Sequence, residues 1–193
     1  MRLTPVSRSE LRVLRDFIDN AFGQQIFKKI TAVFQIYKSV ASKTSYTLLD
    51  KNNNTLIEIA QLFDTYYSAG CPLLESSEGE LSFNVGSIPV LAQFTDHKVK
   101  ITSKAIELFL YGRDIFKKSI IKFEKPIEKN SYAIIVDEKD RAYGIGELLY
   151  SSNEIKNLHE NMVVIKNILD IGFYLRSEDK ILKTGEISNN SGD

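Results

Sequence analysis

His97-Lys-Val-Lys-Ile-Thr-Ser-Lys-Ala-Ile-Glu-Leu-Phe-Leu-Tyr-Gly-Arg-Asp-Ile-Phe116 is the stretch that decides the fold of the C-terminal half. Its first six residues alternate between polar and apolar side chains, which predicts a half-buried strand. Ser103 can cap a short helix that continues through Leu110 with its apolar side chains facing inward. Gly112 stands where such a helix would end. The stretch therefore predicts a strand and a short helix, with a return to extended chain after Gly112.

Short strand candidates follow through the rest of the chain. They lie at residues 114–122, 132–137, 143–150, 162–167 and 171–176. Several short strands separated by turns are typical of a small closed or half-open β-barrel. We therefore predict that residues 97–183 form a small β-barrel domain. The polar stretch 184–193 shows no periodicity, which predicts a disordered tail.

The N-terminal half begins with a strong helix signal. Ser7 and Glu10 have the spacing of a capping box, in which each side chain satisfies the other residue's free backbone amide. Apolar residues then recur at helical spacing over residues 11–22, and Gly23 stands at the expected C-cap. A second apolar set covers residues 26–37. Because β-branched side chains occur in its second half, helix and strand both stay open there.

The rest of the N-terminal half mixes strand and helix signals. Strand-like runs lie at residues 46–50, 55–59, 80–85 and 88–94, and a short helical run lies at 60–68. The Asn-rich turn between the first two runs is typical of a β-hairpin, because Asn tolerates positive φ. Residues 1–96 are therefore predicted to form a small α/β domain. The predicted fold class is α+β, a small N-terminal α/β domain followed by a C-terminal β-barrel.

Charge is balanced over the whole chain but not along it. The 25 Lys and Arg residues match 25 Asp and Glu residues, which excludes a wholly basic nucleic-acid coat. Residues 98–125 nevertheless hold eight basic and three acidic side chains. Such a local excess can bind phosphate, but an ordinary solvated surface gives the same pattern. Charge alone leaves both interpretations open.

Several functional classes find no support in the sequence. Cys71 is the only cysteine, which excludes an internal disulfide and a multi-cysteine metal site. His97 and His159 have no second His or Cys at ligand spacing, so we expect no metal ion and no other cofactor. No catalytic motif or glycine-rich phosphate loop occurs, which predicts that the protein is not an enzyme. No apolar run is long enough to cross a membrane and no signal peptide is present, so we expect an intracellular protein without membrane contact.

The C-terminal half resembles a PUA domain, a compact β-barrel module that binds RNA. The resemblance lies in Phe109–Phe116, Tyr132–Val136, Tyr143–Leu149 with Ser151-Ser152, and Met162–Asn167. Two segments are more specific. Phe109-Leu-Tyr-Gly112 and Asp170-Ile-Gly-Phe-Tyr-Leu-Arg176 are similar to the signature segments of the Nip-seven family. The turn Ala69-Gly-Cys-Pro72 in the N-terminal half resembles the same family.

The Nip-seven family consists of biogenesis factors of the large ribosomal subunit in archaea and eukaryotes. The resemblance implies an N-terminal α/β domain, a C-terminal PUA domain and no catalysis. It implies binding to pre-ribosomal RNA with a preference for single-stranded uridine-rich segments. It also implies other ribosome assembly factors as partners, engaged by the N-terminal domain. Such a protein would be cytoplasmic, or nucleolar in a eukaryote, and the balanced charge with abundant Lys, Ile and Asn indicates an archaeal member.

The residues that the resemblance places on the RNA-facing edge of the barrel fall into two groups. Near the first helix they are Tyr111, Gly112, Arg113, Lys117 and Lys118, and near the last strands they are Lys156, His159, Lys166, Asn167 and Arg176. Lys and Arg would neutralise phosphates, Tyr can stack on a base, and Gly allows close approach of the backbone. Packing is an alternative role for Tyr111. An ion pair with Asp170 or Glu178 is an alternative role for Arg176.

Two other functions stay open. One is an RNA-modifying enzyme, or its accessory subunit, in which the PUA domain delivers the substrate. Against it, the 96 preceding residues are few for such a catalytic domain. The other is a protein-interaction module with little RNA binding, which the zero net charge and the apolar Met162 and Val164 would suit. Salt dependence separates this module from an RNA-binding protein, because binding through phosphates weakens steeply with salt.

Overall fold

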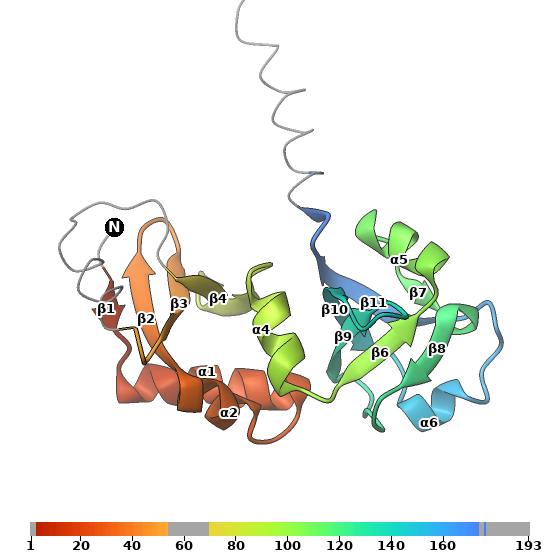
Figure 1. Cartoon of the computed structure of the whole chain (residues 1–193), viewed down its shortest axis with the longest axis horizontal. Coiled ribbons are helices and arrows are strands. Elements are labelled where there is room, and N and C mark those ends of the chain that lie inside the picture. The colour runs from red at the N-terminus through yellow and green to blue at the C-terminus, as the bar shows by residue number, and fades with distance from the viewer. Residues whose placement is uncertain (1–2, 54–69, 174–175, 177–193) are drawn as a thin grey trace, which may run out of the picture.

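The computed structural model describes residues 3–53, 70–173 and Arg176. Its strands form two sheets, one in each half of the chain, which lie next to each other along the long axis of the molecule (Figure 1). Helix α4 (Ser87–Phe94) lies between them, and the chain then enters the second sheet through β6 (Lys98–Ile101). This arrangement confirms the predicted α+β class.

The first sheet has the strand order β1-β2-β3-β4-β5, and all neighbouring strands are antiparallel. Its elements are β1 (Thr4–Pro5), α1 (Arg8–Phe22), α2 (Ile26–Val33), β2 (Phe34–Val40), β3 (Thr44–Asp50), β4 (Cys71–Ser77) and β5 (Glu80–Phe83). Helices α1 and α2 contact each other along one side of this sheet (Figure 1).

Most of the local predictions for this half are confirmed. Ser7 caps α1 with the full capping box, and Gly23 is its C-cap with a φ of 96°. The ambiguous second half of residues 26–37 is strand, because β2 follows α2 directly. The predicted strand 46–50 lies within β3. The predicted strand 55–59, the predicted helix 60–68 and the predicted tail 184–193 lie outside the described residues.

The strand predicted at residues 88–94 is wrong, because these residues form α4. Ile88 and Leu91 are about one helical turn apart, and both are fully buried in the apolar core. Pro89 stands in the first turn, where its missing amide donor removes no hydrogen bond. A short apolar run fits a buried helix as well as a strand, so periodicity alone did not separate the two.

The second sheet has the strand order β7-β11-β10-β9-β6-β8, so β7 and β8 are its edge strands. After β6 its elements are α5 (Ser103–Leu110), β7 (Ile115–Phe116), the 3₁₀ helix η1 (Lys117–Ser119), β8 (Ile120–Phe123), β9 (Tyr132–Val136), β10 (Ala142–Leu148), α6 (Ser152–Ile155) and β11 (Val163–Asp170). Strands β6 and β9 run parallel, and the other neighbours are antiparallel. Register shifts in β10 against both neighbours are bulges, which bend a sheet as a barrel requires.

The strand predicted at residues 114–122 is only partly correct, because η1 divides it into β7 and β8. The backbone amides of Lys117 and Lys118 donate to the carbonyls of Met162 and Glu160, at 2.9 and 3.0 Å. These partners lie in the loop before β11 rather than in a strand. The long-range bonds therefore end β7 after two residues.

The strand predicted at residues 171–176 is also wrong, because β11 ends at Asp170. Gly172 lies tightly against the end of α5, where an added Cβ would collide with the carbonyl oxygen of Leu110. The chain turns there instead of continuing along the sheet.

One apolar cluster joins the two sheets. Phe22 of α1 and Phe83 of β5 both pack their rings against Tyr132 of β9, with ring centroids 6.2 and 6.0 Å apart. Ile134 and Ile145 of the second sheet are fully buried in the same cluster as the apolar side chains of α1, α2 and α4. A second cluster fills the inside of the C-terminal barrel around the fully buried Phe109. The two halves therefore share part of their core.

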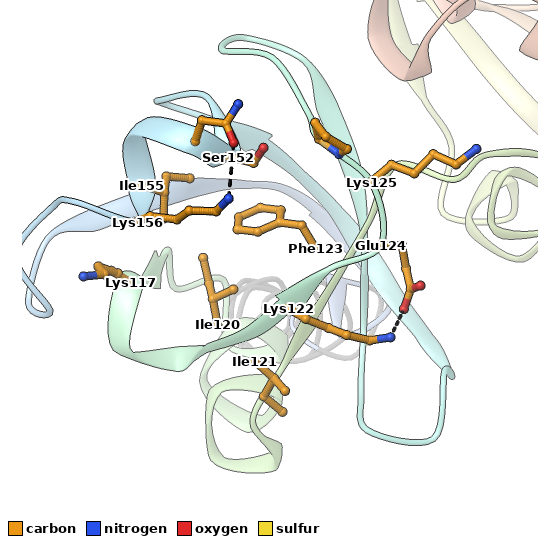
Figure 2. Close-up of a pocket in the computed structure, with 12 residues that line it drawn as sticks. Lys117, Ile120, Ile121, Lys122, Phe123, Glu124, Lys125, Ser152, Ile155 and Lys156 are labelled. Atoms are coloured by element: carbon orange, nitrogen blue, oxygen red, sulfur yellow. Dashed lines mark hydrogen bonds and ion pairs between the residues drawn. The ribbon is translucent and has the colours of Figure 1, made fainter.

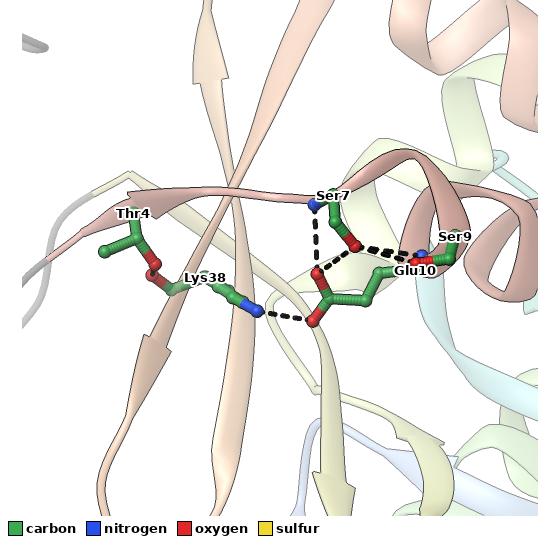
Figure 3. A network of polar contacts seen from close by, with 5 residues as sticks. All are labelled: Thr4, Ser7, Ser9, Glu10 and Lys38. Atoms are coloured by element: carbon green, nitrogen blue, oxygen red, sulfur yellow. Dashed lines mark hydrogen bonds and ion pairs between the residues drawn. The ribbon is translucent and has the colours of Figure 1, made fainter.

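A polar network ties the start of α1 to β2 (Figure 3). The Glu10 carboxylate accepts from the backbone amide of Ser7 at 2.9 Å and from its hydroxyl at 2.7 Å. The other carboxylate oxygen of Glu10 forms an ion pair with the Lys38 ammonium at 2.6 Å. The hydrogen bond from Lys38, followed by those from Ser7, lowers the pKa of Glu10 to about 2.

We expect this network to make stability depend on pH in the acid range. The pKa of Glu10 is about 2 in the folded chain, against an ordinary value of 4.5, so its contribution is complete above about pH 4.5 and is lost as the pH falls toward 2. Glu10→Gln should therefore flatten the fall of the unfolding free energy between pH 5 and about pH 2. Urea unfolding at a series of pH values measures this, with Glu80→Gln at an exposed position of β5 as the control. A Glu10→Gln curve parallel to that of the unchanged protein would contradict the assignment.

Candidate nucleic-acid interface

The turn that ends α5 presents Tyr111 and Arg113 to solvent. Gly112 has a φ of 78°, a left-handed conformation that glycine adopts without strain. Its amide donates to the carbonyl of Phe109 at 2.9 Å, and the Arg113 amide donates to that of Leu108 at 3.2 Å, which closes the helix end. The Tyr111 side chain is 75% exposed, so the predicted packing alternative does not describe it. Arg113 is exposed and has no side-chain partner among the described residues.

Two of the residues predicted to contact RNA hold this turn in place. The Arg176 guanidinium donates to the Leu110 carbonyl and forms two bonds to the Asp170 carboxylate, at 2.9 and 2.8 Å. The Asn167 amide donates to the Phe109 carbonyl at 2.7 Å. Both side chains thus satisfy carbonyls at the C-terminal end of α5, which have no partner within the helix. The alternative ion pair between Arg176 and Asp170 is present, and its hydrogen bonds raise the pKa of Arg176.

The lysines of η1 contact the loop before β11. The Lys117 ammonium donates to the Leu158 carbonyl at 2.7 Å and pairs with Glu160 at 2.9 Å. The Lys118 ammonium donates to the Asn161 side chain at 2.9 Å. These contacts join η1 to the segment 158–161, which also contains the predicted His159.

The remaining predicted residues are exposed. Lys156 has one weak contact, to the Asn153 side chain at 3.3 Å, and His159 accepts from the Asn161 amide at 3.2 Å through Nδ1. Lys166 has no side-chain partner among the described residues. The backbone amide of residue 167 donates to Asp114 at 2.8 Å, so Lys166 and Arg113 each adjoin one end of this bond. The backbones of the two segments that carry these exposed cations are therefore joined.

We call this surface the β7–β11 face. It comprises Tyr111, Gly112, Arg113, Lys117, Lys118, Lys156, His159, Lys166, Asn167 and Arg176. The exposed aromatic and cationic side chains project from a backbone turn that hydrogen bonds hold in place. This arrangement suits a single-stranded nucleic acid. The sequence reasoning missed Phe116, which is 38% exposed and has the Lys118 ammonium 5.7 Å from its ring. Its alternation with the buried Ile115 would have indicated an outward position.

Cys71 and His97, two of the residues considered for nucleophilic or metal chemistry, form hydrogen bonds within the fold. The Cys71 thiol donates to the Gly86 carbonyl at 3.1 Å, and burial raises the pKa of this thiol. Burial likewise lowers the pKa of His97, whose ring contacts the Tyr132 carbonyl at 3.3 Å. Within the described ranges, no group of three or more His, Cys, Asp or Glu side chains is placed to hold a metal ion. No helix in those ranges has the length and apolar character needed to span a bilayer.

Comparisons with known proteins connect this surface to a family. Residues 97–179 match a family model described as the UPF0113 PUA domain. A UPF0113 protein from Archaeoglobus fulgidus is 36% identical over 86 residues, which cover 45% of this chain and 49% of that protein. The 60S ribosome subunit biogenesis protein NIP7 of Saccharomyces cerevisiae is 29% identical over 103 residues, 53% of this chain and 57% of that protein. The chain thus spans about half the length of the curated relatives it matches.

A solved structure shares the fold of both halves. The crystal structure of a PUA domain from Aeropyrum pernix K1 matches 93% of this chain and 91% of its own, with a TM-score of 0.63 and 12% sequence identity. Together with the family match, this likeness shows that the C-terminal half has the fold of a PUA domain. Residues 97–179 thus resemble the UPF0113 PUA-domain family, and relatives named as 60S ribosome subunit biogenesis proteins agree with the resemblance to the Nip-seven family.

Proposed function

We propose that this protein binds single-stranded RNA through its PUA domain and acts, without catalysis, in the assembly of the large ribosomal subunit. The observation that carries the proposal is the β7–β11 face, where the exposed Tyr111 and the unpaired Arg113 lie on a UPF0113 PUA domain. The relatives named as 60S ribosome subunit biogenesis proteins support the place of action.

The finer parts of the proposal concern the domains and their ligands. Residues 97–183 would hold pre-ribosomal RNA, with a preference for uridine-rich segments, and residues 1–96 would contact other assembly factors. The protein would work in the cytoplasm, or in the nucleolus if the source is a eukaryote. The Archaeoglobus fulgidus relative supports an archaeal source.

Binding of two fluorescent RNAs tests the function. A short uridine-rich RNA and a matched adenine-rich RNA are titrated with the full chain at two salt concentrations, and the anisotropy is measured. We expect salt-sensitive binding that is tighter for the uridine-rich RNA, because phosphate contacts release counterions on binding. Absence of binding at the lower salt would contradict the proposal and favour a protein-interaction module.

The double variant Arg113→Ala, Lys166→Ala tests the face itself. Each phosphate contact to a single strand contributes about 0.7 to the slope of log K against log salt, so losing two contacts should reduce the slope by about 1.4. The matched control is Arg8→Ala, Arg12→Ala, which removes two exposed cations from α1 in the other half. An unchanged slope in the first variant would remove the β7–β11 face from the proposal. A reduced slope in the control would move the site to the N-terminal half.

A further inference from the structure

A groove of about 440 Å³ opens between β8 and α6, next to the β7–β11 face (Figure 2). Its size lies within the range of small-ligand sites, roughly 300–1,000 Å³. One wall is formed by β8 and residues 124–126, and the other by α6 with Lys156. Lys117 closes one end. We call it the β8–α6 groove.

The floor of the groove is apolar and contains an aromatic ring. Ile155 is 2% exposed and forms part of the barrel core, whereas Ile121 is 47% exposed. Phe123 is half-buried, and its ring lies centrally among the lining side chains in Figure 2. An aromatic ring that packs against the core on one side and is accessible on the other can stack on a flat ring.

The rim of the groove is basic. Four of the lining side chains are lysines and one is a carboxylate, namely Lys117, Lys122, Lys125, Lys156 and Glu124. Lys122 pairs with Glu124, whereas the acidic partners of Lys117 and Lys125 lie outside the groove and are more than half exposed. The pairs of Lys122 and Lys125 are weak surface pairs, so these two ammonium groups can exchange their partners for a bound phosphate. Lys117 is held more firmly, because its side chain is 19% exposed and its ammonium also donates to the Leu158 carbonyl.

We infer that the β8–α6 groove binds one nucleotide of the RNA strand that the β7–β11 face holds, with the base stacked on Phe123 and its phosphate among the rim lysines. This inference rests on the proposed function. A nucleotide fits because it combines a flat apolar face with a phosphate, which match the aromatic floor and the basic rim. Lys117 belongs to both surfaces, so the face and the groove are continuous at this residue, where the exposed Glu160 pairs with its ammonium group. Stacking accepts any base, so the groove would add affinity rather than sequence preference.

Phe123→Leu tests the inference while keeping an apolar side chain toward the core. We expect this variant to bind a ten-nucleotide single-stranded RNA about tenfold more weakly, since one stacked base contributes a factor of this order. Photocrosslinking of the unchanged full chain to the same RNA carrying 4-thiouridine should label the tryptic peptide that contains Phe123. Lys122→Ala should also weaken binding, and Lys28→Ala on α2 serves as the charge control.

The outcomes separate the groove from the function. Weaker binding by Phe123→Leu with an unchanged melting temperature, together with the crosslink at Phe123, supports the inference. Unchanged affinity of this variant, with crosslinks confined to residues 111–118, overturns the groove and leaves the proposed function standing. If the unchanged protein binds no RNA, both proposals fail. If Phe123→Leu unfolds, the crosslink and the Lys122→Ala affinity decide.

Discussion

Arg176→Ala is expected to lower the free energy of unfolding by about 3–5 kcal/mol, the cost of leaving a buried carboxylate without its ionic partner. The Asp170 side chain is 2% exposed, and Arg176 supplies two of its hydrogen bonds. The substitution also removes the donor that satisfies the Leu110 carbonyl. Urea unfolding followed by circular dichroism measures the loss.

Two comparisons make this result specific. Asp140→Asn breaks the ion pair between Asp140 and Lys100 while keeping a residue that tolerates the φ of 62° at this position. Because the carboxylate is 63% exposed, this change should cost less than about 1 kcal/mol. Replacing both partners, as Asp170→Leu with Arg176→Met, should cost less than Arg176→Ala alone, because no unpaired charge is left behind. If Arg176→Ala instead weakens RNA binding without any loss of stability, Arg176 is a direct RNA contact and the role inferred from its bonds is wrong.

Phe22→Ala should be as damaging, at about 3–5 kcal/mol, although it lies far along the chain from the PUA domain. Phe22 is 1% exposed, and its ring packs against Phe83 and Tyr132 at centroid distances of 5.4 and 6.2 Å. Because Tyr132 belongs to β9, the cavity opens in the core that both sheets share. In urea unfolding of Phe22→Ala, the loss of secondary structure and the change in tyrosine fluorescence should therefore coincide in a single transition. Its midpoint should lie at a lower urea concentration than that of the unchanged protein.

Val13→Ala is the matched control, since Val13 lies on the same helix and is 58% exposed. Its effect should stay within about 0.5 kcal/mol, as is usual for surface substitutions. Two separate transitions in Phe22→Ala, with the PUA domain retaining its original midpoint, would show that the halves do not depend on their shared core.

Local signals in the sequence predicted the elements whose ends are set by nearby residues. The capping box at Ser7 and Glu10 and the glycine at the end of α1 act within a few residues, so their effects can be read directly. Residues 87–94 could not be assigned in this way, because a buried helix of eight residues shows no polar face. The break at η1 depends on carbonyls more than 40 residues later in the chain, which no local pattern reveals.

Among the residues of the candidate site, the sequence did not predict which are exposed and which are bound to the protein itself. The resemblance placed Tyr111 and Arg113 on one surface with residues of the last strand, and the fold brings them together. It did not distinguish Arg113, which is exposed, from Arg176, which is tied to Asp170. Both are arginines in signature segments, and only the tertiary contacts separate them. The β8–α6 groove was also missed, because its two walls lie about 30 residues apart in the chain.

The core shared by the two sheets has a mechanical consequence. Helix α1 contacts β9, and helix α4 contacts β9 and β10. The two halves are therefore packed against each other as well as joined by the chain. Two ligands bound at opposite ends of such a molecule would be held at a fixed distance and angle to each other. A change in the relative position of the two ligands would then require the shared core to come apart.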